Sequence, residues 1–282
     1  MPYCLYFKSD IASFFTKVPH AEIIRFIDLE CEDPDFRAMI ERALSIQLRN
    51  ESDLREYLRL FPADEIGVPQ GSALSALAGN IFLHEVDLLM KNQSDIRFIR
   101  YIDDVIILGK TNEAVQNARS SLQRELRKRN LTLYDPSTHP SKAASGHSRD
   151  GFDYLGCSIE LNHIAPAKPT KAKIIDKVES EIRIAKANIA EILSSNSPTR
   201  SKQTVYVQSL ANIDEIVRGW ANSFRFANNR LPFFQIDKAV SETVRAFGLW
   251  FRSMNILDTG QRMRALGIFQ AADTEHRKIE DY

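Results

Sequence analysis

Two adjacent carboxylates, Asp103 and Asp104, stand between the apolar runs Phe98–Ile102 and Val105–Leu108. Short apolar runs on either side of a polar step are typical of two strands joined by a tight turn, so we expect the acids at a hairpin tip. Neighbouring carboxylates repel each other unless a positive group holds them, and a divalent cation is the common solution. An isolated Asp pair is also typical of a solvated turn, because Asp is a favoured turn residue. Features upstream of the pair decide between these interpretations.

The first upstream feature is a third acid, Asp10, which follows the short apolar stretch Tyr3–Lys8 and precedes the aromatic pair Phe14-Phe15. If that stretch is a strand next to the hairpin, three carboxylates converge at one place on a sheet. Such a group is suited to bracket two magnesium ions about 4 Å apart. Mg²⁺ prefers oxygen ligands, so carboxylates without His or Cys are the expected donor set.

The second upstream feature is the turn Gly67-Val68-Pro69-Gln70-Gly71-Ser72. Its glycines and proline predict a tight turn at a helix start, where backbone N–H groups and the Gln70 amide are available to a nucleotide. Taken alone, the segment is more typical of an ordinary loop.

The remaining pattern predicts a mixed α/β domain followed by a smaller helical one. Helical periodicity covers residues 20–30, 35–50, 72–91, 112–129, 170–194, 201–221 and 235–253, and strand patterns cover 152–159 and 163–165.

Charge constrains the surface, because 37 Lys and Arg balance 37 Asp and Glu. A net charge of zero is unusual for a nucleic-acid-binding protein, so any basic surface must be local. Residues 119–149 hold seven Lys or Arg against two acids, and residues 168–186 hold six against three. These stretches are either solvated helix faces or surfaces that meet phosphates.

The sequence has no apolar run long enough to span a membrane, and its three cysteines are widely spaced. We therefore expect no membrane association, reduced thiols and a cytoplasmic location.

Taken together, the motifs resemble those of reverse transcriptases. Asp10 with Phe14-Phe15, then residues 69–83, then residues 100–104 look like motifs A, B and C in their usual order. Residues 152–156 are similar to the primer-grip region. Residues 218–225 resemble the thumb, or maturase, signature of bacterial group II intron-like and retron-like enzymes, so that the resemblance spans residues 3–250.

The resemblance implies an α+β fold. A ferredoxin-like polymerase palm, an antiparallel sheet with helices on one face, would occupy residues 1–166. A helical thumb would follow over 167–253, and a C-terminal tail over 254–282. Relatives carry a fingers region upstream of motif A, whereas this chain begins nine residues before Asp10. Three alternatives follow: the chain is a fragment of a longer protein, a partner chain supplies fingers, or this is a minimal form.

The resemblance also assigns roles to individual residues. Asp10, Asp103 and Asp104 would be catalytic and, with the Ile11 carbonyl, would bind two Mg²⁺ ions. Phe15 would exclude a 2′-hydroxyl from the incoming sugar, and Lys142 would donate a proton to pyrophosphate. The predicted nucleotide contacts are Phe15, Gln70, Gly71 and Lys142, and the predicted primer or template contacts are Tyr101, Leu155, Gly156, Lys171, Lys173, Arg218 and Trp220.

The implied activity is that of an RNA-directed DNA polymerase, which adds deoxynucleotides to a DNA primer on an RNA template. The alternative is an RNA-binding maturase, or a polymerase-like subunit without catalysis of its own. Ile102 departs from the alanine that is common in bacterial relatives. A mobile intron, a retron-like element and an antiviral defence system all remain open as biological settings.

Overall fold

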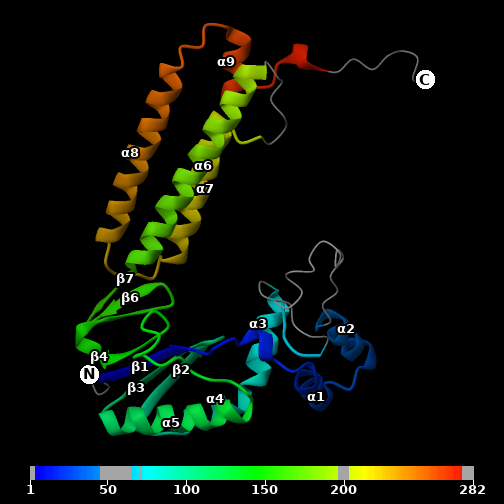
Figure 1. Cartoon of the computed structure of the whole chain (residues 1–282), viewed down its shortest axis with the longest axis vertical. Coiled ribbons are helices and arrows are strands. Elements are labelled where there is room, and N and C mark those ends of the chain that lie inside the picture. Colours follow the sequence, from blue (N-terminus) through cyan, green and yellow to red (C-terminus); the bar gives the residue numbers. More distant parts are fainter. Residues whose placement is uncertain (1–3, 45–64, 70–71, 196–202, 275–282) are drawn as a thin grey trace. The chain divides into compact units, whose positions relative to one another are not determined.

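A computed structural model describes residues 4–44, 65–69, 72–195 and 203–274, which form two compact units, Met1–Gly151 and Phe152–Tyr282 (Figure 1). Each unit is described by itself. The elements of the first unit are β1 (Leu5–Asp10), η1 (Phe15–Lys17), α1 (His20–Glu30), α2 (Pro34–Leu44), α3 (Ala73–Phe82), α4 (His84–Lys91), β2 (Ile96–Tyr101), β3 (Asp104–Gly109), α5 (Asn112–Lys128), β4 (Ala143–His147) and η3 (Ser148–Asp150).

The first unit is built on a four-stranded antiparallel sheet with the strand order β2-β3-β1-β4. The predicted α+β class and the hairpin are therefore confirmed. Strand β4 was not predicted, because its sequence Ala143–His147 lacks the β-branched and aromatic residues that favour strands. It pairs along the free edge of β1, where tertiary contact replaces local propensity.

Helices α4 and α5 cover one face of this sheet (Figure 1). Phe7 of β1 and Ile107 of β3 pair directly and are fully buried in one cluster with Val115 and Leu122 of α5. Side chains alternate between the two faces of a strand. The residues next to Phe7 and Ile107 therefore point to the other face, away from α5.

The segment predicted as one helix over residues 72–91 is two helices. Helix α3 begins after Ser72, whose hydroxyl accepts the Leu74 N–H, and ends at Leu83. Leu83 leaves helical geometry (φ −100°, ψ 5°) and is completely buried, so its packing in the core accompanies the break. Helix α3 also carries Gly79, against which the Phe14 ring packs so closely that an added Cβ would lie 2.6 Å from it.

The second unit begins with a small antiparallel sheet and continues with helices. Its elements are β5 (Phe152–Tyr154), β6 (Cys157–Glu160), β7 (His163–Pro166), α6 (Lys168–Ser195), α7 (Tyr206–Ser223), α8 (Leu231–Ser253), α9 (Thr259–Leu266) and η4 (Ala271–Asp273). The strand predicted over 152–159 is the hairpin of β5 and β6, since Leu155 and Gly156 adopt the positive φ values of a tight turn. Helix α9 lies in the segment predicted as a tail.

The helices of the second unit share one apolar core. Buried positions of α6 recur every three or four residues, from Val178 to Ile192, which gives one continuous apolar stripe. Phe247 and Phe251 of α8 pack against this stripe together with Tyr206. Over the described residues, no helix is both long enough and apolar enough to cross a membrane. The predicted domain limits at residues 166 and 253 stay predictions.

Candidate active site

Asp10 and Asp104 lie opposite each other on the neighbouring strands β1 and β3. Asp10 ends β1, Asp104 begins β3, and the two are direct partners in the antiparallel register. Directly paired residues project to the same face with Cβ atoms about 5 Å apart, and alternation puts this pair on the face opposite to α5. Asp103 lies next to them in the hairpin turn, where its carbonyl accepts the Ile11 N–H at 2.8 Å. The strand register therefore gathers all three predicted acids.

The turn between β2 and β3 is strained. Ile102 has φ 59°, although a left-handed first position in a two-residue hairpin usually holds glycine. A β-branched residue in this region costs on the order of 1–3 kcal/mol. The Ile102 side chain packs against the main apolar core, which offsets part of that cost.

Arg100 ties this turn to the helices. Its side chain is only 6% exposed and forms an ion pair with both carboxylate oxygens of Asp87 on α4. The same guanidinium donates to the Asn80 amide oxygen on α3 at 3.1 Å and to the Ile102 carbonyl at 2.8 Å. The sequence analysis missed this role. The available signal was a charged residue inside an apolar strand, which requires a buried partner.

Lys142 lies beside Asp10. Its Nζ donates to Asp10 Oδ2 at 2.7 Å, and its carbonyl accepts the Asp10 N–H at 3.1 Å where β4 joins β1. The structure therefore brings the predicted lysine to the predicted acids, through the strand that the sequence pattern did not reveal.

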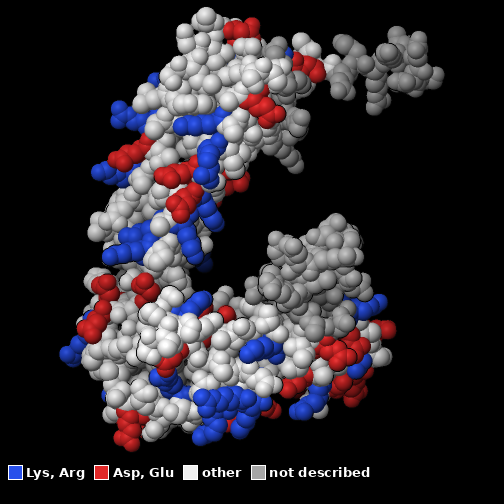
Figure 2. Space-filling model, in the orientation of Figure 1, with Lys and Arg blue, Asp and Glu red and all other residues white. Residues whose placement is uncertain are grey.

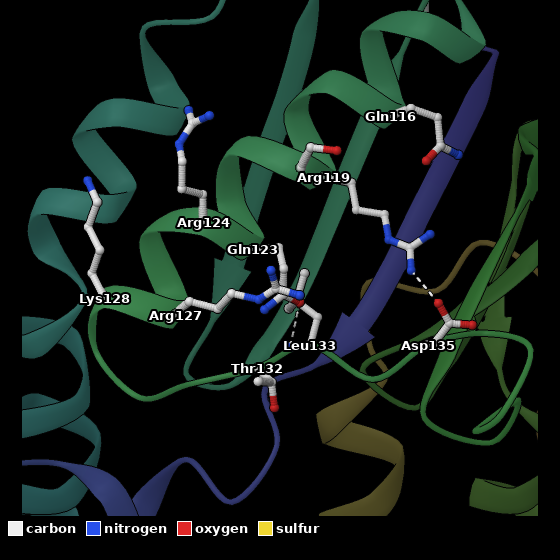
Figure 3. A pocket seen from close by; sticks show the side chains of 10 residues that line it. Gln116, Arg119, Gln123, Arg124, Arg127, Lys128, Thr132, Leu133 and Asp135 are labelled. Carbon is white, nitrogen blue, oxygen red and sulfur yellow. Dashed lines mark hydrogen bonds and ion pairs between the residues drawn. The ribbon is translucent and has the colours of Figure 1, made fainter.

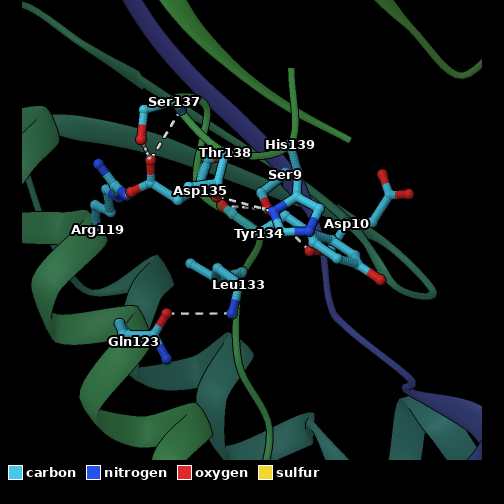
Figure 4. A network of polar contacts seen from close by, with 10 residues as sticks. All are labelled: Ser9, Asp10, Arg119, Gln123, Leu133, Tyr134, Asp135, Ser137, Thr138 and His139. Carbon is cyan, nitrogen blue, oxygen red and sulfur yellow. Dashed lines mark hydrogen bonds and ion pairs between the residues drawn. The ribbon is translucent and has the colours of Figure 1, made fainter. Parts of the chain in front are cut away.

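A loop over residues 131–139 supports the end of β1 (Figure 4). The Tyr134 N–H donates to the Asp10 carbonyl at 3.3 Å, and the Ser9 hydroxyl donates to the carbonyls of Asp10 and Tyr134. The Tyr134 ring packs on His139 with the ring centres 4.9 Å apart. These contacts fix the backbone of Asp10 independently of its carboxylate.

Burial and neighbouring charge disfavour the ionisation of Asp103 and Asp104. Burial, followed by the charge of Asp10, a hydrogen bond with it and the charge of Asp103, raises the pKa of Asp104 to about 6. Burial and then the charge of Asp10 also raise the pKa of Asp103, against a backbone hydrogen bond and Lys142. The Asp10 carboxylate raises the pKa of Lys142. The group thus carries more negative charge than the single lysine compensates.

The aromatic pair and the turn before α3 are joined by their backbones. The Val68 N–H donates to the Phe15 carbonyl at 2.7 Å, and the Gly67 N–H donates to the Val18 carbonyl at 2.7 Å. Phe14 is buried, and the half-buried Phe15 packs beside it. Gln70 and Gly71 lie outside the described residues. Tyr101, next to the acids in the chain, is 58% exposed.

The other predicted contact residues lie in the second unit. Leu155 and Gly156 form the exposed β5–β6 turn, and the Gly156 carbonyl accepts the Thr170 hydroxyl and the Ala167 N–H. Trp220 packs between Phe224 and Phe233, and its indole N–H is buried without a partner among the described residues. The three predicted cations have different surroundings. Lys171 donates to Gln235, and Arg218 pairs with Asp214 on the same helix. Lys173 lines a hollow of about 400 Å³ beside Trp220.

Comparison with known families decides the class of this chain. Residues 2–159 match the family model described as reverse transcriptase (RNA-dependent DNA polymerase). The chain belongs to the reverse transcriptase family. The motif resemblance is thereby confirmed at family level, whereas the bacterial lineage stays a prediction.

Curated relatives of this reverse transcriptase include two fungal intron proteins. The putative COX1/OXI3 intron 2 protein of Saccharomyces cerevisiae is 22% identical over 259 residues, covering 71% of this chain and 28% of that protein. An uncharacterized 91 kDa protein in the cob intron of Schizosaccharomyces pombe is 29% identical over 85 residues, covering 30% of this chain and 10% of that protein. The chain therefore spans under a third of the length of either relative.

Solved structures similar to this reverse transcriptase include two telomerases. Apo telomerase of Candida tropicalis has a TM-score of 0.38 at 13% identity, covering 59% of this chain and 36% of that one. Telomerase of Candida albicans, in complex with a fragment of telomeric RNA, has the same score and identity, covering 84% and 40%.

The acids of this reverse transcriptase suit a hard divalent cation by their chemistry. They offer carboxylate oxygens alone, and the pKa of Asp104 is raised by burial and then by the negative charges of Asp10 and Asp103, which a cation would offset. Among the described residues, no group of three His, Cys, Asp or Glu side chains is already arranged to hold a metal ion. Lys142 binds Asp10 in this arrangement, so a cation at the acids competes with its ammonium group.

Replacing Arg100 tests how the hairpin is held. Arg100→Met should lower the free energy of unfolding by about 2–4 kcal/mol, because it leaves Asp87 and the Ile102 carbonyl without their donor. Arg37→Met is the matched control: Arg37 pairs with Asp28 and Glu41 but is 41% exposed, so the expected loss is about 0–1 kcal/mol. Urea unfolding measures both. Equal losses would contradict the role assigned to Arg100.

The raised pKa of Asp104 predicts an unusual pH dependence in magnesium-free buffer. The folded protein holds this proton up to about pH 6, whereas the unfolded chain releases it near 3.8. Stability should therefore fall as the pH rises from about 4 to 6, since the folded state binds more protons in that window. Asp104→Asn should flatten this fall, and Asp95→Asn, which removes an exposed carboxylate, should leave it unchanged. Thermal unfolding in EDTA across this range measures the effect, and a wild-type slope in Asp104→Asn would contradict it.

Proposed function

We propose that this chain is the palm and thumb of an RNA-directed DNA polymerase, which extends a DNA primer with deoxynucleoside triphosphates on an RNA template. The observation that carries the proposal is the pairing of Asp10 with Asp104 across β1 and β3, with Asp103 in the adjoining turn, in a chain of the reverse transcriptase family. Three acids forced together at the end of a rigid sheet are costly to folding, which is expected where a site serves chemistry.

In this proposal, Asp10, Asp103 and Asp104 hold two magnesium ions, with the Ile11 carbonyl as a further ligand. The bound ions would lower the pKa of the attacking primer hydroxyl and neutralise the triphosphate. Other residues of the chain hold the three carboxylates in place. Strand pairing fixes Asp10 and Asp104, and the hydrogen bond from Arg100 to the Ile102 carbonyl fixes the turn that carries Asp103.

Lys142 has a role that changes when the acids bind cations. While it pairs with Asp10, its ammonium group is stabilised and its pKa is raised, so it is a poor proton donor. Once Asp10 is engaged elsewhere, the ammonium group can turn to the phosphates of the nucleotide and give a proton to the leaving pyrophosphate. The pairing with Asp10 supports this role because it places Lys142 within one side chain's reach of the acids.

Phe15 is proposed to set the choice of sugar, with Gln70 and Gly71 as further nucleotide contacts. A phenyl ring leaves no space for a 2′-hydroxyl and offers it no hydrogen bond. The backbone bond from Val68 to Phe15 supports this role, because it anchors the aromatic residue to the turn that precedes Gln70. The proposed primer and template contacts are Tyr101, Leu155, Gly156, Lys171, Lys173, Arg218 and Trp220.

The second candidate function is RNA binding without catalysis, as in a maturase. The intron proteins among the relatives favour it. A fingers-bearing segment or partner is part of either proposal. Catalysis separates the two candidates, because both would bind RNA but only the polymerase would extend a primer.

Replacing one acid tests the polymerase proposal. Asp103→Asn should reduce magnesium-dependent extension of a DNA primer on an RNA template by at least about 10²-fold, because charge stabilisation of the transition state is lost. Asp95→Asn, an exposed change in the same unit, should leave the rate unchanged. RNA binding should survive in both variants. Extension at the wild-type rate by Asp103→Asn would refute the assignment, and RNA binding without extension by the wild-type chain, even with a fingers segment supplied, would favour the maturase.

Phe15→Ala tests the sugar gate. Discrimination against ribonucleotides should fall by about tenfold or more, because a pocket that rejects a hydroxyl by shape gains roughly 1–3 kcal/mol of selectivity. Phe36→Ala, at a partly exposed ring on α2, is the control. The ratio of incorporation of deoxynucleotides to ribonucleotides measures the effect. Unchanged sugar selectivity in Phe15→Ala would remove the gate from the account.

A further inference from the structure

A basic groove runs along the outer side of α5. It has a volume of about 960 Å³ and lies between α5 and the segment 132–135 (Figure 3). Four of its lining residues are cations (Arg119, Arg124, Arg127 and Lys128), and one, Asp135, is an acid. Lys and Arg side chains also gather over α5 on the molecular surface (Figure 2). Cations of the basic stretch over residues 119–149 thus line a groove.

The charge of this groove is only partly compensated. Hydrogen bonds from Ser137, and then the contact with Arg119 at 2.6 Å, lower the pKa of Asp135 to about 2. Lys128 is paired with Glu125 at 2.8 Å. Arg124 reaches Glu125 only at 3.9 Å, and Arg127 has no ion pair among the described residues. Two exposed arginines therefore supply net positive charge.

Side chains that can donate hydrogen bonds line the groove along one face of α5. Gln116, Arg119, Gln123 and Arg127 recur at helical spacing, and Figure 3 shows the last three extending toward the segment 132–135. The Gln123 amide oxygen accepts the Leu133 N–H at 3.1 Å, which leaves its buried amide nitrogen without a partner among the described residues. Arg119 and Arg127 lie eight residues apart, about 12 Å along the helix. The groove is therefore long enough to meet more than one phosphate of a bound strand.

We propose that this groove binds the sugar–phosphate backbone of RNA at a site separate from the acids. The acids lie on the face of the sheet opposite to α5, so one bound strand cannot occupy both places through the same nucleotides. The inference goes beyond the proposed polymerase activity, because it concerns RNA outside the primer–template duplex.

The chemistry of the lining favours RNA over other polyanions. Among the described residues, no aromatic side chain lines the groove, so their lining offers no stacking platform for bases and is suited to phosphates. The hydroxyls of Ser120 and Thr132 and the amide of Gln116 can both donate to and accept from a 2′-hydroxyl, which DNA lacks. Leu133 is the one apolar residue of the lining, whereas a docked protein usually needs a larger apolar anchor.

Charge reversal at Arg124 and Arg127 tests the site in the full chain. These two residues are preferred to Arg119, because the segment that Arg119 contacts is hydrogen-bonded to the backbone of Asp10 and Ala12. The control, Arg25→Glu with Lys91→Glu, changes the net charge equally at exposed positions of the same unit. The probe is a labelled, 3′-blocked RNA stem-loop, added to protein that is saturated with an unlabelled DNA-primed RNA template.

Fluorescence anisotropy between about 50 and 200 mM salt gives the affinity and its salt dependence. Arg124→Glu with Arg127→Glu should weaken stem-loop binding about tenfold at low salt and make the slope of log K against log salt shallower by about 1.5. The control pair should bind as the wild type does. Extension of the primed template should proceed at the wild-type rate in both, which separates this site from the polymerase proposal.

Three outcomes would overturn the inference. The groove variant could bind the stem-loop as tightly as the control pair, or the saturated wild-type chain could fail to bind it while still extending primers. A DNA stem-loop or a polyglutamate peptide could displace the RNA at equal concentration of charge, which would show a general anion surface. Stem-loop binding that depends on the groove in a wild-type chain without extension activity would instead support this site and refute the polymerase proposal.

Discussion

The repulsion between Asp10 and Asp104 is the constraint on which the first unit depends. Pairing of β1 with β3 places these two carboxylates directly opposite each other. Like charges opposite each other on one face of a sheet are destabilising, so the surrounding structure has to hold the strands in register. Phe7 and Ile107 do so from the buried face, where they join the core under α5. Lys142 offsets part of the charge from β4. Without these contacts the two strands would gain by moving apart.

The hairpin turn adds a second cost that tertiary contacts offset. Ile102 holds a left-handed backbone conformation beside Asp103. Arg100 stabilises this conformation, because its guanidinium donates to the Ile102 carbonyl and also binds Asp87 and Asn80. A strained, over-determined turn next to a group of acids is a common feature of functional sites. The position of Asp103 thus depends, through Arg100, on Asn80 of α3 and Asp87 of α4.

Patterns of local sequence were sufficient for the acids but not for their supports. The apolar runs around Asp103 predicted the hairpin, and the short strand before Asp10 predicted its neighbour. Strand β4 was missed because its small residues carry no strand signal, although it delivers Lys142 to Asp10. The break at Leu83 and the partner of Arg100 were equally inaccessible, since both depend on how α4 packs against the sheet. Gln70 and Gly71 lie outside the described residues, so their role rests on the family alone.

The central claim is that the three carboxylates are a cation site that Lys142 vacates. The most direct measurement is the anomalous scattering of Mn²⁺ in crystals of the chain with a primed RNA template, a chain-terminating primer end and a deoxynucleotide. We predict two peaks about 4 Å apart, bounded by the carboxylates of Asp10, Asp103 and Asp104, with the Lys142 ammonium group moved from Asp10 to the triphosphate. Manganese bound elsewhere, or Lys142 still paired with Asp10 in the loaded complex, would contradict the account.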